Sequence, residues 1–286
     1  MGPLPTDCPT MSRSNLANAR WTPRRMVAMT DSARTHSTRV AVVSDVHGNA
    51  VALQAVLREL ADASPDLVVF GGDLTWGPLP EETWALVEPL RSSAIFVSGN
   101  AERGLAESAA RIDGGVGADL SPRERWMVEQ HSVYTRARLG TFVDTTVVEI
   151  SGLGAVRFCH GSPRSDEELI TFATPETRMR ALLEGVQERV LVSAHTHIQF
   201  DRTVAGIRSV NPGSVGMPYE GRPGLAFWAL LGSDVELRQT PYDLDEAVRR
   251  YRATDDPLAE QMVEILVEPP TPEEVIDDAE AREFAG

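Results

Sequence analysis

The sequence contains no lysine, because all 27 of its basic residues are arginine. This absence excludes any Schiff-base chemistry that depends on a lysine amine. Cysteine is nearly as scarce: Cys8 and Cys159 are the only two, and they stand far apart. The chain therefore has no disulfide framework, which fits a reducing compartment and leads us to expect a cytoplasmic protein.

Long apolar runs are also missing. No uninterrupted run approaches the roughly 18–20 residues that a membrane span requires, so we expect no membrane partner. Residues 1–38 contain five Arg and two Asp but no apolar segment, which argues against a secretory signal. We interpret 1–38 as a disordered extension; a targeting peptide, or a true start further downstream, would be the alternatives.

Acidic residues dominate the charge, which is −15 in total. Residues 254–286 hold eleven acids and one Arg, and this end of the chain also contains a Pro-Pro-Thr-Pro run. We interpret 253–286 as an acidic C-terminal tail, flexible or only loosely docked, which leaves 39–252 as the folded domain. The acidic balance makes a nucleic-acid backbone partner unlikely, and the oligomeric state stays undefined.

The first half of the chain alternates strand and helix patterns. Apolar, β-branched runs predict strands at 39–43, 66–70 and 94–97, and apolar spacing predicts helices at 49–61 and 80–90. This order favours a parallel sheet with right-handed crossovers. Polar motifs follow each strand, at the carboxyl ends where open α/β sheets bind their ligands.

The second half reads differently. Residues 102–120 are rich in Gly and Ala, and we expect a mobile excursion over the site; one helix is predicted at 121–139 and another at 175–188. Three two-residue turns predict hairpins and hence a mostly antiparallel second sheet: Ser151-Gly152, Ala205-Gly206 and Gly232-Ser233. Two packed sheets with outer helices would form an α/β fold, a four-layer α/β/β/α sandwich.

Seven side chains in the polar motifs are candidate metal ligands. Asp45 and His47 lie two positions apart after a strand, so both can reach one cation. His195 and His197 repeat this spacing and are the strongest local signal. Asp73, Asn100 and His160 each have an ordinary structural alternative as turn or core residues. Together the seven supply enough ligands for two adjacent divalent cations. Two-metal sites of this kind commonly catalyse displacement at phosphorus.

The order and spacing of these five motifs resemble the calcineurin-like metallophosphoesterase superfamily, over about residues 39–240. Asn211-Pro212-Gly213-Ser214-Val215-Gly216 resembles its small bacterial and archaeal phosphodiesterase branch. The resemblance implies the four-layer sandwich, and it implies two metal sites with Asp73 bridging them. One site would comprise Asp45, His47, Asp73 and His197, and the other Asp73, Asn100, His160 and His195.

Oxygen and imidazole ligands without thiolate suit two ions of Mn, Fe or Zn, with Mn favoured in vitro. In the implied mechanism a metal-bridging hydroxide attacks phosphorus in line. Besides Asp73, we expect Asn49 at a helix start to support or contact phosphate, and Arg103 to contact phosphate. The alternative for Arg103 is a solvated position at the start of a helix.

One departure from the family pattern affects the expected substrate. Many members carry His directly after the Gly-Asn pair, where this chain has Ala101. General acid catalysis contributes typically about 10²–10⁴-fold, so we expect a preference for activated or diester substrates. Glu102 or Arg103 are candidates to replace that His in part.

The sequence therefore predicts a hydrolase, a dinuclear metal-dependent phosphodiesterase acting on a small or nucleotide-like phosphate ester. Two alternatives stay open. A catalytically silent binding module on the same fold has a precedent in the retromer subunit of this fold family. A phosphomonoesterase or phosphoprotein phosphatase is the other.

Overall fold

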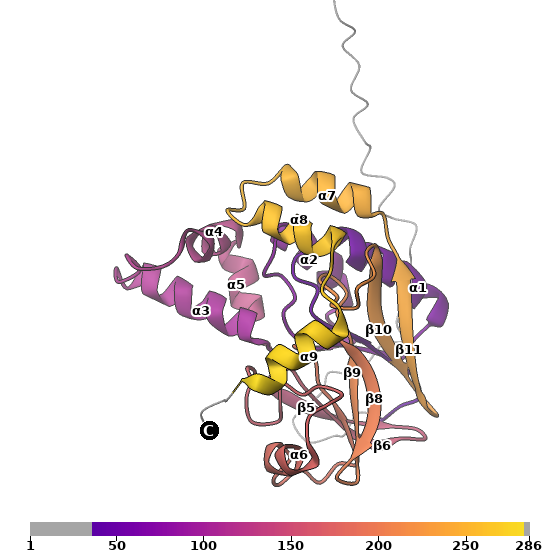
Figure 1. Ribbon diagram of the computed structural model, residues 1–286. Helices are drawn as coiled ribbons and strands as arrows, with labels where there is room; N and C mark the ends of the chain where they lie inside the picture. The colour runs from indigo at the N-terminus through magenta and orange to yellow at the C-terminus, as the bar shows by residue number, and fades with distance from the viewer. Residues whose placement is uncertain (1–35, 283–286) are drawn as a thin grey trace, which may run out of the picture.

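The computed structural model describes residues 36–282, which form two mixed β-sheets packed face to face with helices outside them (Figure 1). The extension expected at 1–38 falls mostly outside this range, as do residues 283–286. Residues 36 and 37 of this extension form β1 (His36–Ser37), which pairs in parallel with β5 (Thr145–Ile150). In the described range no helix is both long and apolar enough to cross a membrane.

The first sheet contains the three strands expected from the first half of the chain. Its spatial order is β11 (Val235–Pro241), β10 (Leu225–Leu231), β2 (Val40–Val43), β3 (Leu67–Phe70) and β4 (Ala94–Phe96). β2, β3 and β4 are parallel and in close register, so their carboxyl ends lie along one edge. The crossovers are α1 (Ala50–Ala63), and α2 (Pro80–Val87) with the short 3₁₀ helix η2 (Glu88–Leu90).

The second sheet differs from the expected antiparallel one. Its order is β1, β5, β6 (Gly154–Cys159), β7 (Val190–Val192), β9 (Ile207–Pro212) and β8 (Gln199–Val204). The three predicted hairpins are confirmed, but β7 runs parallel to both its neighbours. The β10–β11 hairpin extends the first sheet instead, because β10 pairs with β2. Local turn signals predict a hairpin but not the sheet that it joins.

Alternate residues of β2 show the layers directly. Val40 and Val42 pack between the two sheets with residues such as Val156, whereas Ala41 and Val43 face the helical side with Leu53 of α1. β2 is buried on both faces, as a central parallel strand should be. On the far side of the second sheet, α6 (Glu176–Leu182) packs against its outer face. The expected α/β/β/α sandwich is therefore confirmed.

Two helical regions depart from expectation. The supposed mobile excursion is mostly α3 (Asn100–Asp113), whose buried Ala101, Leu105 and Ala109 recur at helical spacing. The predicted helix at 121–139 is two helices, α4 (Pro122–Gln130) and α5 (Val133–Leu139). Helix α4 ends at its C-cap residue, His131. The next residue, Ser132, caps the N-terminus of α5, because its hydroxyl accepts the Thr135 N–H. The small residues of this segment made the apolar face of α3 hard to recognise in the sequence.

The acidic C-terminal region is helical and docked, not loosely attached. After α7 (Leu244–Arg252) come α8 (Ala259–Val267) and α9 (Pro272–Ala281). Met262, Val263 and Leu266 of α8 pack with Ala247 and Tyr251 of α7 in one buried cluster. Figure 1 shows α9 in yellow, crossing in front of the second sheet. Acidic composition obscured an apolar face that recurs every three or four residues.

Candidate metal centre

All seven predicted ligands lie close together in the loops that follow the carboxyl ends of strands from both sheets. Asp45 and His47 follow β2, Asp73 follows β3, and Asn100 begins α3 directly after β4. The second sheet contributes His160 after β6, and His195 and His197 from the loop between β7 and β8. Six of the seven form two groups of three with metal-compatible spacing: Asp45, His47 and His197, and Asp73, His160 and His195.

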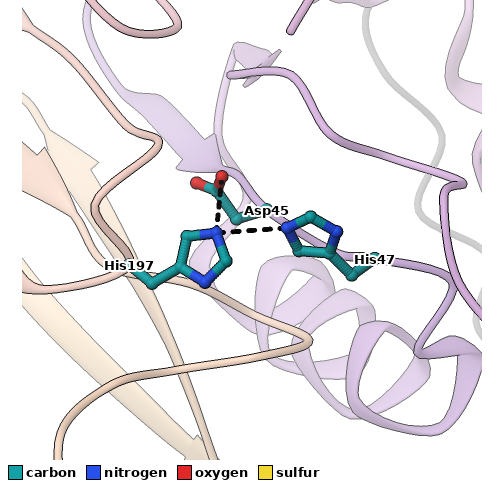
Figure 2. Close-up of side chains that lie close together, drawn as sticks. All are labelled: Asp45, His47 and His197. Carbon is teal, nitrogen blue, oxygen red and sulfur yellow. Dashed lines mark hydrogen bonds and ion pairs between the residues drawn. The ribbon is translucent and has the colours of Figure 1, made fainter. Parts of the chain in front are cut away.

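The first group is compact and buried (Figure 2). The Nε2 atoms of His47 and His197 lie 3.1 Å apart. Asp45 Oδ1 lies 3.2 Å from Nε2 of His197. Three ligand atoms from two sheets thus point at one small volume.

Asp73 connects this group with the second. Its Oδ2 lies 3.6 Å from Nε2 of His47, and its Oδ1 lies 3.4 Å from Nε2 of His160. Around His160 Nε2, Asn100 Oδ1 lies at 3.0 Å and His195 Nδ1 at 3.1 Å. Asp73 therefore presents one carboxylate oxygen to each group.

Backbone carbonyls fix the tautomers of three histidines. The Nδ1 atom of His47 donates to the carbonyl of Trp76 at 3.3 Å. In the same way, Nδ1 of His160 donates to the carbonyl of Gly71 at 2.8 Å, and Nδ1 of His197 donates to that of Met217 at 2.7 Å. Because a carbonyl only accepts, Nδ1 carries the proton and a neutral ring presents a lone pair at Nε2. In the first group two such lone pairs face each other.

Facing lone pairs and carboxylates repel unless a cation lies between them. Asp45 Oδ1 is buried and accepts no hydrogen bond from any described residue. A buried acceptor left unpaired costs about 1–3 kcal/mol. A divalent cation in each group would satisfy these atoms, so the donor set fits the metals that the sequence implies.

The backbone around the site is strained. Of the seven non-glycine residues with positive φ in the described range, five are ligands: Asp45, His47, Asp73, His195 and His197. Such conformations cost of order 1–3 kcal/mol each and persist where the surrounding structure enforces them. Here each one turns a side chain from the end of a strand toward the neighbouring strands.

Two glycines permit the close approach of the loops. A Cβ on Gly99 would lie 2.2 Å from Oδ1 of Asp73, and one on Gly72 would lie 2.5 Å from Nδ1 of His160. Gly72 also has φ +102°, where other residues are strained. Any side chain at either position would push the ligand loops apart.

Burial and charge set the protonation of the ligands. Burial, aided by the neighbouring histidine, lowers the pKa of His47 and of His195 to about 4. Burial raises the pKa of Asp45 and Asp73, but the histidines around each outweigh it and hold both pKa values low. Ionised carboxylates and neutral imidazoles are the forms that bind metals.

His160 behaves differently. Burial lowers its pKa, but Asp73 and Asp45 oppose this effect and raise the pKa to about 10. The two carboxylates thus favour positive charge at His160. A metal ion would replace the proton, because ligands must be deprotonated to bind it.

Glu102 supports the ligand loops. Its two oxygens accept the N–H groups of Asp73 and Leu74, both at 2.9 Å, and of Gly99 at 2.8 Å. The side chain is 6% exposed, and its bonds tie α3 to the loop after β3. The expectation that Glu102 replaces the missing His does not fit these contacts. The sequence signal was the helix start at Gly99-Asn100, with Glu at its third position.

Tyr219 is a further neighbour that no sequence signal predicted. Its ring stacks on that of His197, with centroids 4.6 Å apart. This stacking and the hydrogen bond from Nδ1 to the carbonyl of Met217 together hold the imidazole in place. The loop carrying both residues follows the Asn211–Gly216 segment.

Asn49 and Arg103 make other contacts. The Asn49 amide caps α1 by accepting the Ala52 N–H and donates to the Gly216 carbonyl. Arg103 pairs with Asp166 at 2.7 Å. Its remaining nitrogens pair with Glu107 and Glu167. Their predicted contacts with phosphate stay predictions.

A cavity of about 370 Å³ opens beside His47, Asp73 and Asn100. This volume lies at the lower end of the roughly 300–1,000 Å³ typical of ligand pockets. Residues of α3, α4 and α8 and the loop after β3 form its other walls. At the position of the absent His, Ala101 lines the cavity and donates its N–H to Asp73 Oδ1 at 2.9 Å.

Comparisons with known proteins agree with this fold. Residues 38–231 match the family described as the calcineurin-like phosphoesterase superfamily domain. Among solved structures, a hypothetical protein from Pyrococcus horikoshii OT3 is 21% identical with a TM-score of 0.68, covering 83% of this chain and 100% of its own. A metallophosphoesterase from Sphaerobacter thermophilus is 24% identical with a TM-score of 0.61, covering 81% and 99%. No curated protein matches the sequence.

Proposed function

We propose a function from the premise that this chain belongs to the calcineurin-like phosphoesterase superfamily, to which residues 38–231 assign it. Membership supports a hydrolase acting on phosphate esters. The finer proposal is a dinuclear metal-dependent phosphodiesterase with a small or nucleotide-like substrate. The two alternatives in the same superfamily are a silent binding module and a phosphomonoesterase.

The observation that carries the proposal is the position of Asp73 between two groups of ligands. One oxygen lies 3.6 Å from His47 Nε2 and the other lies 3.4 Å from His160 Nε2. A single carboxylate facing two imidazole clusters is suited to bridging two cations. One cation would have Asp45, His47, Asp73 and His197 as ligands, and the other Asp73, Asn100, His160 and His195.

Two divalent ions bound there would supply the charge that neutralises phosphate oxygens and activates water. The mixed oxygen and imidazole donors suit Mn, Fe or Zn. The chain itself holds the geometry: backbone carbonyls orient three imidazoles, and Glu102 fixes the loop of Asp73. Preformed ligands of this kind lower the reorganisation needed during reaction.

The preference for diesters rests on the missing general acid. In the cavity wall Ala101 replaces a His, and the carboxylate of Glu102 is engaged with backbone amides. A leaving group that needs a proton would therefore receive little help from the described side chains at this position. Activated esters and diesters with good leaving groups depend least on such help.

The test compares hydrolysis of bis-p-nitrophenyl phosphate with that of p-nitrophenyl phosphate. Enzyme stripped by chelation is titrated with Mn²⁺, and metal content is measured at each point. We expect turnover that favours the diester and saturates near two ions per chain. Faster monoester turnover would favour the phosphomonoesterase. Folded protein that binds metal but turns over neither ester would favour the binding module.

A further inference from the structure

One cationic side chain lines the cavity beside the metal ligands. Arg123, on α4, forms part of its wall together with Trp76, Met217 and Met262. The side chain of Arg123 is 14% exposed, so it is largely removed from water. Arg103, in contrast, is absent from this wall.

Arg123 is held in place from outside the cavity. Its Nη2 donates to Oδ2 of Asp256 at 3.1 Å, and the Asp256 side chain is fully buried. Oδ1 of Asp256 accepts the N–H of Leu258 at 2.9 Å, at the start of α8. The ion pair thus joins α4 to the C-terminal helices and fixes the direction of the guanidinium.

This anchor leaves donors unused. Arg123 Nε is buried and has no hydrogen-bond partner among the described residues. A guanidinium has five N–H donors, and the bond to Asp256 uses one nitrogen. Leaving a buried donor unpaired costs about 1–3 kcal/mol, and more when the group is charged. The ion pair with Asp256 therefore leaves donors of this guanidinium without a partner among the described residues.

We infer that Arg123 binds a second phosphate of the substrate, so that the substrate is a nucleotide-type phosphodiester with another phosphate beside the scissile one. This inference rests on the proposed function. The scissile diester would lie at the ligands, where its single charge is neutralised. Arg123 lines the same cavity and keeps guanidinium donors that Asp256 does not use, and a phosphate matches the forked geometry of such a group.

The apolar walls suit the rest of such a molecule. Trp76 offers an aromatic face of the kind on which nucleobases stack. Met217 and Met262 are flexible and polarisable, so they adapt to an irregular ligand. Met262 lies on α8, beyond the matched residues 38–231. The chain's own C-terminal helices would therefore define the substrate, while the shared domain supplies the metal ligands.

The test uses two dinucleotides with the same scissile bond. Adenylyl-(3′→5′)-adenosine (ApA) lacks the second phosphate, and its 5′-phosphorylated form (pApA) has it. For the metal-loaded wild type, we expect kcat/KM to favour pApA. In Arg123→Gln, kcat/KM for pApA should fall roughly 10–100-fold, as expected for hydrogen bonds to a charged group. The value for ApA should change less than about 3-fold on the same scale.

Three further variants separate binding from folding. Arg123→Gln leaves Asp256 buried without its partner, so the double variant Arg123→Gln/Asp256→Asn tests the same loss with that charge removed. Arg125→Gln, on the same helix but outside the cavity wall, should resemble wild type. Arg123→Lys keeps the charge without the fork and should recover only part of the preference.

The outcomes distinguish this inference from the proposed function. Equal losses for ApA and pApA, or no loss for either, would overturn the second-phosphate site while leaving the phosphodiesterase intact. If the wild type hydrolyses neither dinucleotide nor p-nitrophenyl esters, the proposed function fails. In that case the inference is tested by measuring the affinities of adenosine 3′,5′-bisphosphate and of adenosine by calorimetry. A preference for the bisphosphate that disappears in Arg123→Gln and in the double variant Arg123→Gln/Asp256→Asn supports the inference; unchanged binding refutes it.

Discussion

The carboxylate of Glu102 accepts the backbone N–H of Asp73 at 2.9 Å, so the proposed bridging residue is held by a residue from another element. The neighbouring N–H of Leu74 donates to the other oxygen at 2.9 Å. Glu102 thus clamps the strained turn after β3 from the first turn of α3. It acts through Asp73 and is a positioning residue.

Replacing Glu102 with Gln should weaken this clamp. The amide presents N–H donors where backbone N–H groups already point, so at least one buried donor loses its acceptor, at about 1–3 kcal/mol. We expect a lower Tm and a metal affinity reduced about 10–100-fold, as for other groups that orient ligands. Differential scanning fluorimetry and metal titration measure both. Glu107→Gln, on the exposed face of the same helix, is the control; similar losses in it would refute the clamp.

Asp73→Asn tests the bridge itself. A carboxamide presents only one oxygen, so it cannot offer an anionic ligand to both groups. We expect metal content to fall at both positions, and activity to fall by more than the about 10–100-fold typical of outer ligand-orienting groups. Metal analysis by mass spectrometry gives the stoichiometry. Loss of only one ion per chain would show that Asp73 belongs to a single site; Asp201→Asn, which lies on β8 and pairs with Arg208, serves as the control.

Arg103→Gln decides between two roles for that residue. Its guanidinium, with a side chain 40% exposed, pairs with Asp166, Glu107 and Glu167. Exposed ion pairs contribute about 0–1 kcal/mol, so we expect little change in Tm and kcat/KM within about 3-fold of wild type. A selective increase in KM for the diester, with unchanged Tm, would instead support the phosphate contact predicted from the sequence.

The sequence revealed the candidate ligands because their chemistry depends on short motifs at the ends of apolar strands. Asp45 and His47, or His195 and His197, can be recognised two positions apart without knowledge of the fold. The roles of Asn49 and Arg103 could not be recognised in this way. Asn49 has its amide in a helix cap and a tertiary contact with Gly216, and nothing in its neighbours along the chain indicates that contact.

The helical errors have a related cause. Residues 100–113 form a helix because Ala101, Leu105 and Ala109 face the core, yet small side chains produce a weak apolar pattern. Likewise, the buried Asp256 pairs with Arg123, which comes from another helix 133 positions away in sequence. Local composition indicated an acidic tail, whereas tertiary partners determine where the C-terminal helices lie.

The docking of α8 leads to a stability prediction. Leu266 is 2% exposed and packs in the cluster with Ala247 and Tyr251, whereas the adjacent Val267 is 44% exposed. Leu266→Ala should lower the free energy of unfolding by about 2–5 kcal/mol, because it leaves a cavity. Val267→Ala should change it by less than about 0.5 kcal/mol. Denaturant titration measures both. Equal and small effects would mean that the C-terminal helices are only loosely attached in solution.

The last prediction concerns pH and His131, which lies away from the ligands between α4 and α5. Its Nδ1 donates to the Met127 carbonyl at 2.6 Å, and its Nε2 lies 2.9 Å from the hydroxyl of Thr75, in the loop after Asp73. Burial lowers the pKa of His131 below its usual 6.5, although the Met127 carbonyl and Glu81 oppose the shift. The folded state therefore holds the ring neutral at a pH where the unfolded chain already takes up a proton.

Because the folded-state pKa is lowered, the stability that the neutral ring contributes is fully present above about pH 6.5 and is lost as pH falls toward the folded-state pKa. The difference in stability between wild type and His131→Gln should therefore be largest near pH 8 and shrink toward pH 5. Thr75→Val removes the hydroxyl contact but keeps the imidazole, so its curve should keep the wild-type pH slope. Thermal unfolding of all three proteins at each pH gives the comparison. Because the ligand histidines titrate in every variant, their effect cancels in the difference, and parallel curves for wild type and His131→Gln would disprove the assignment.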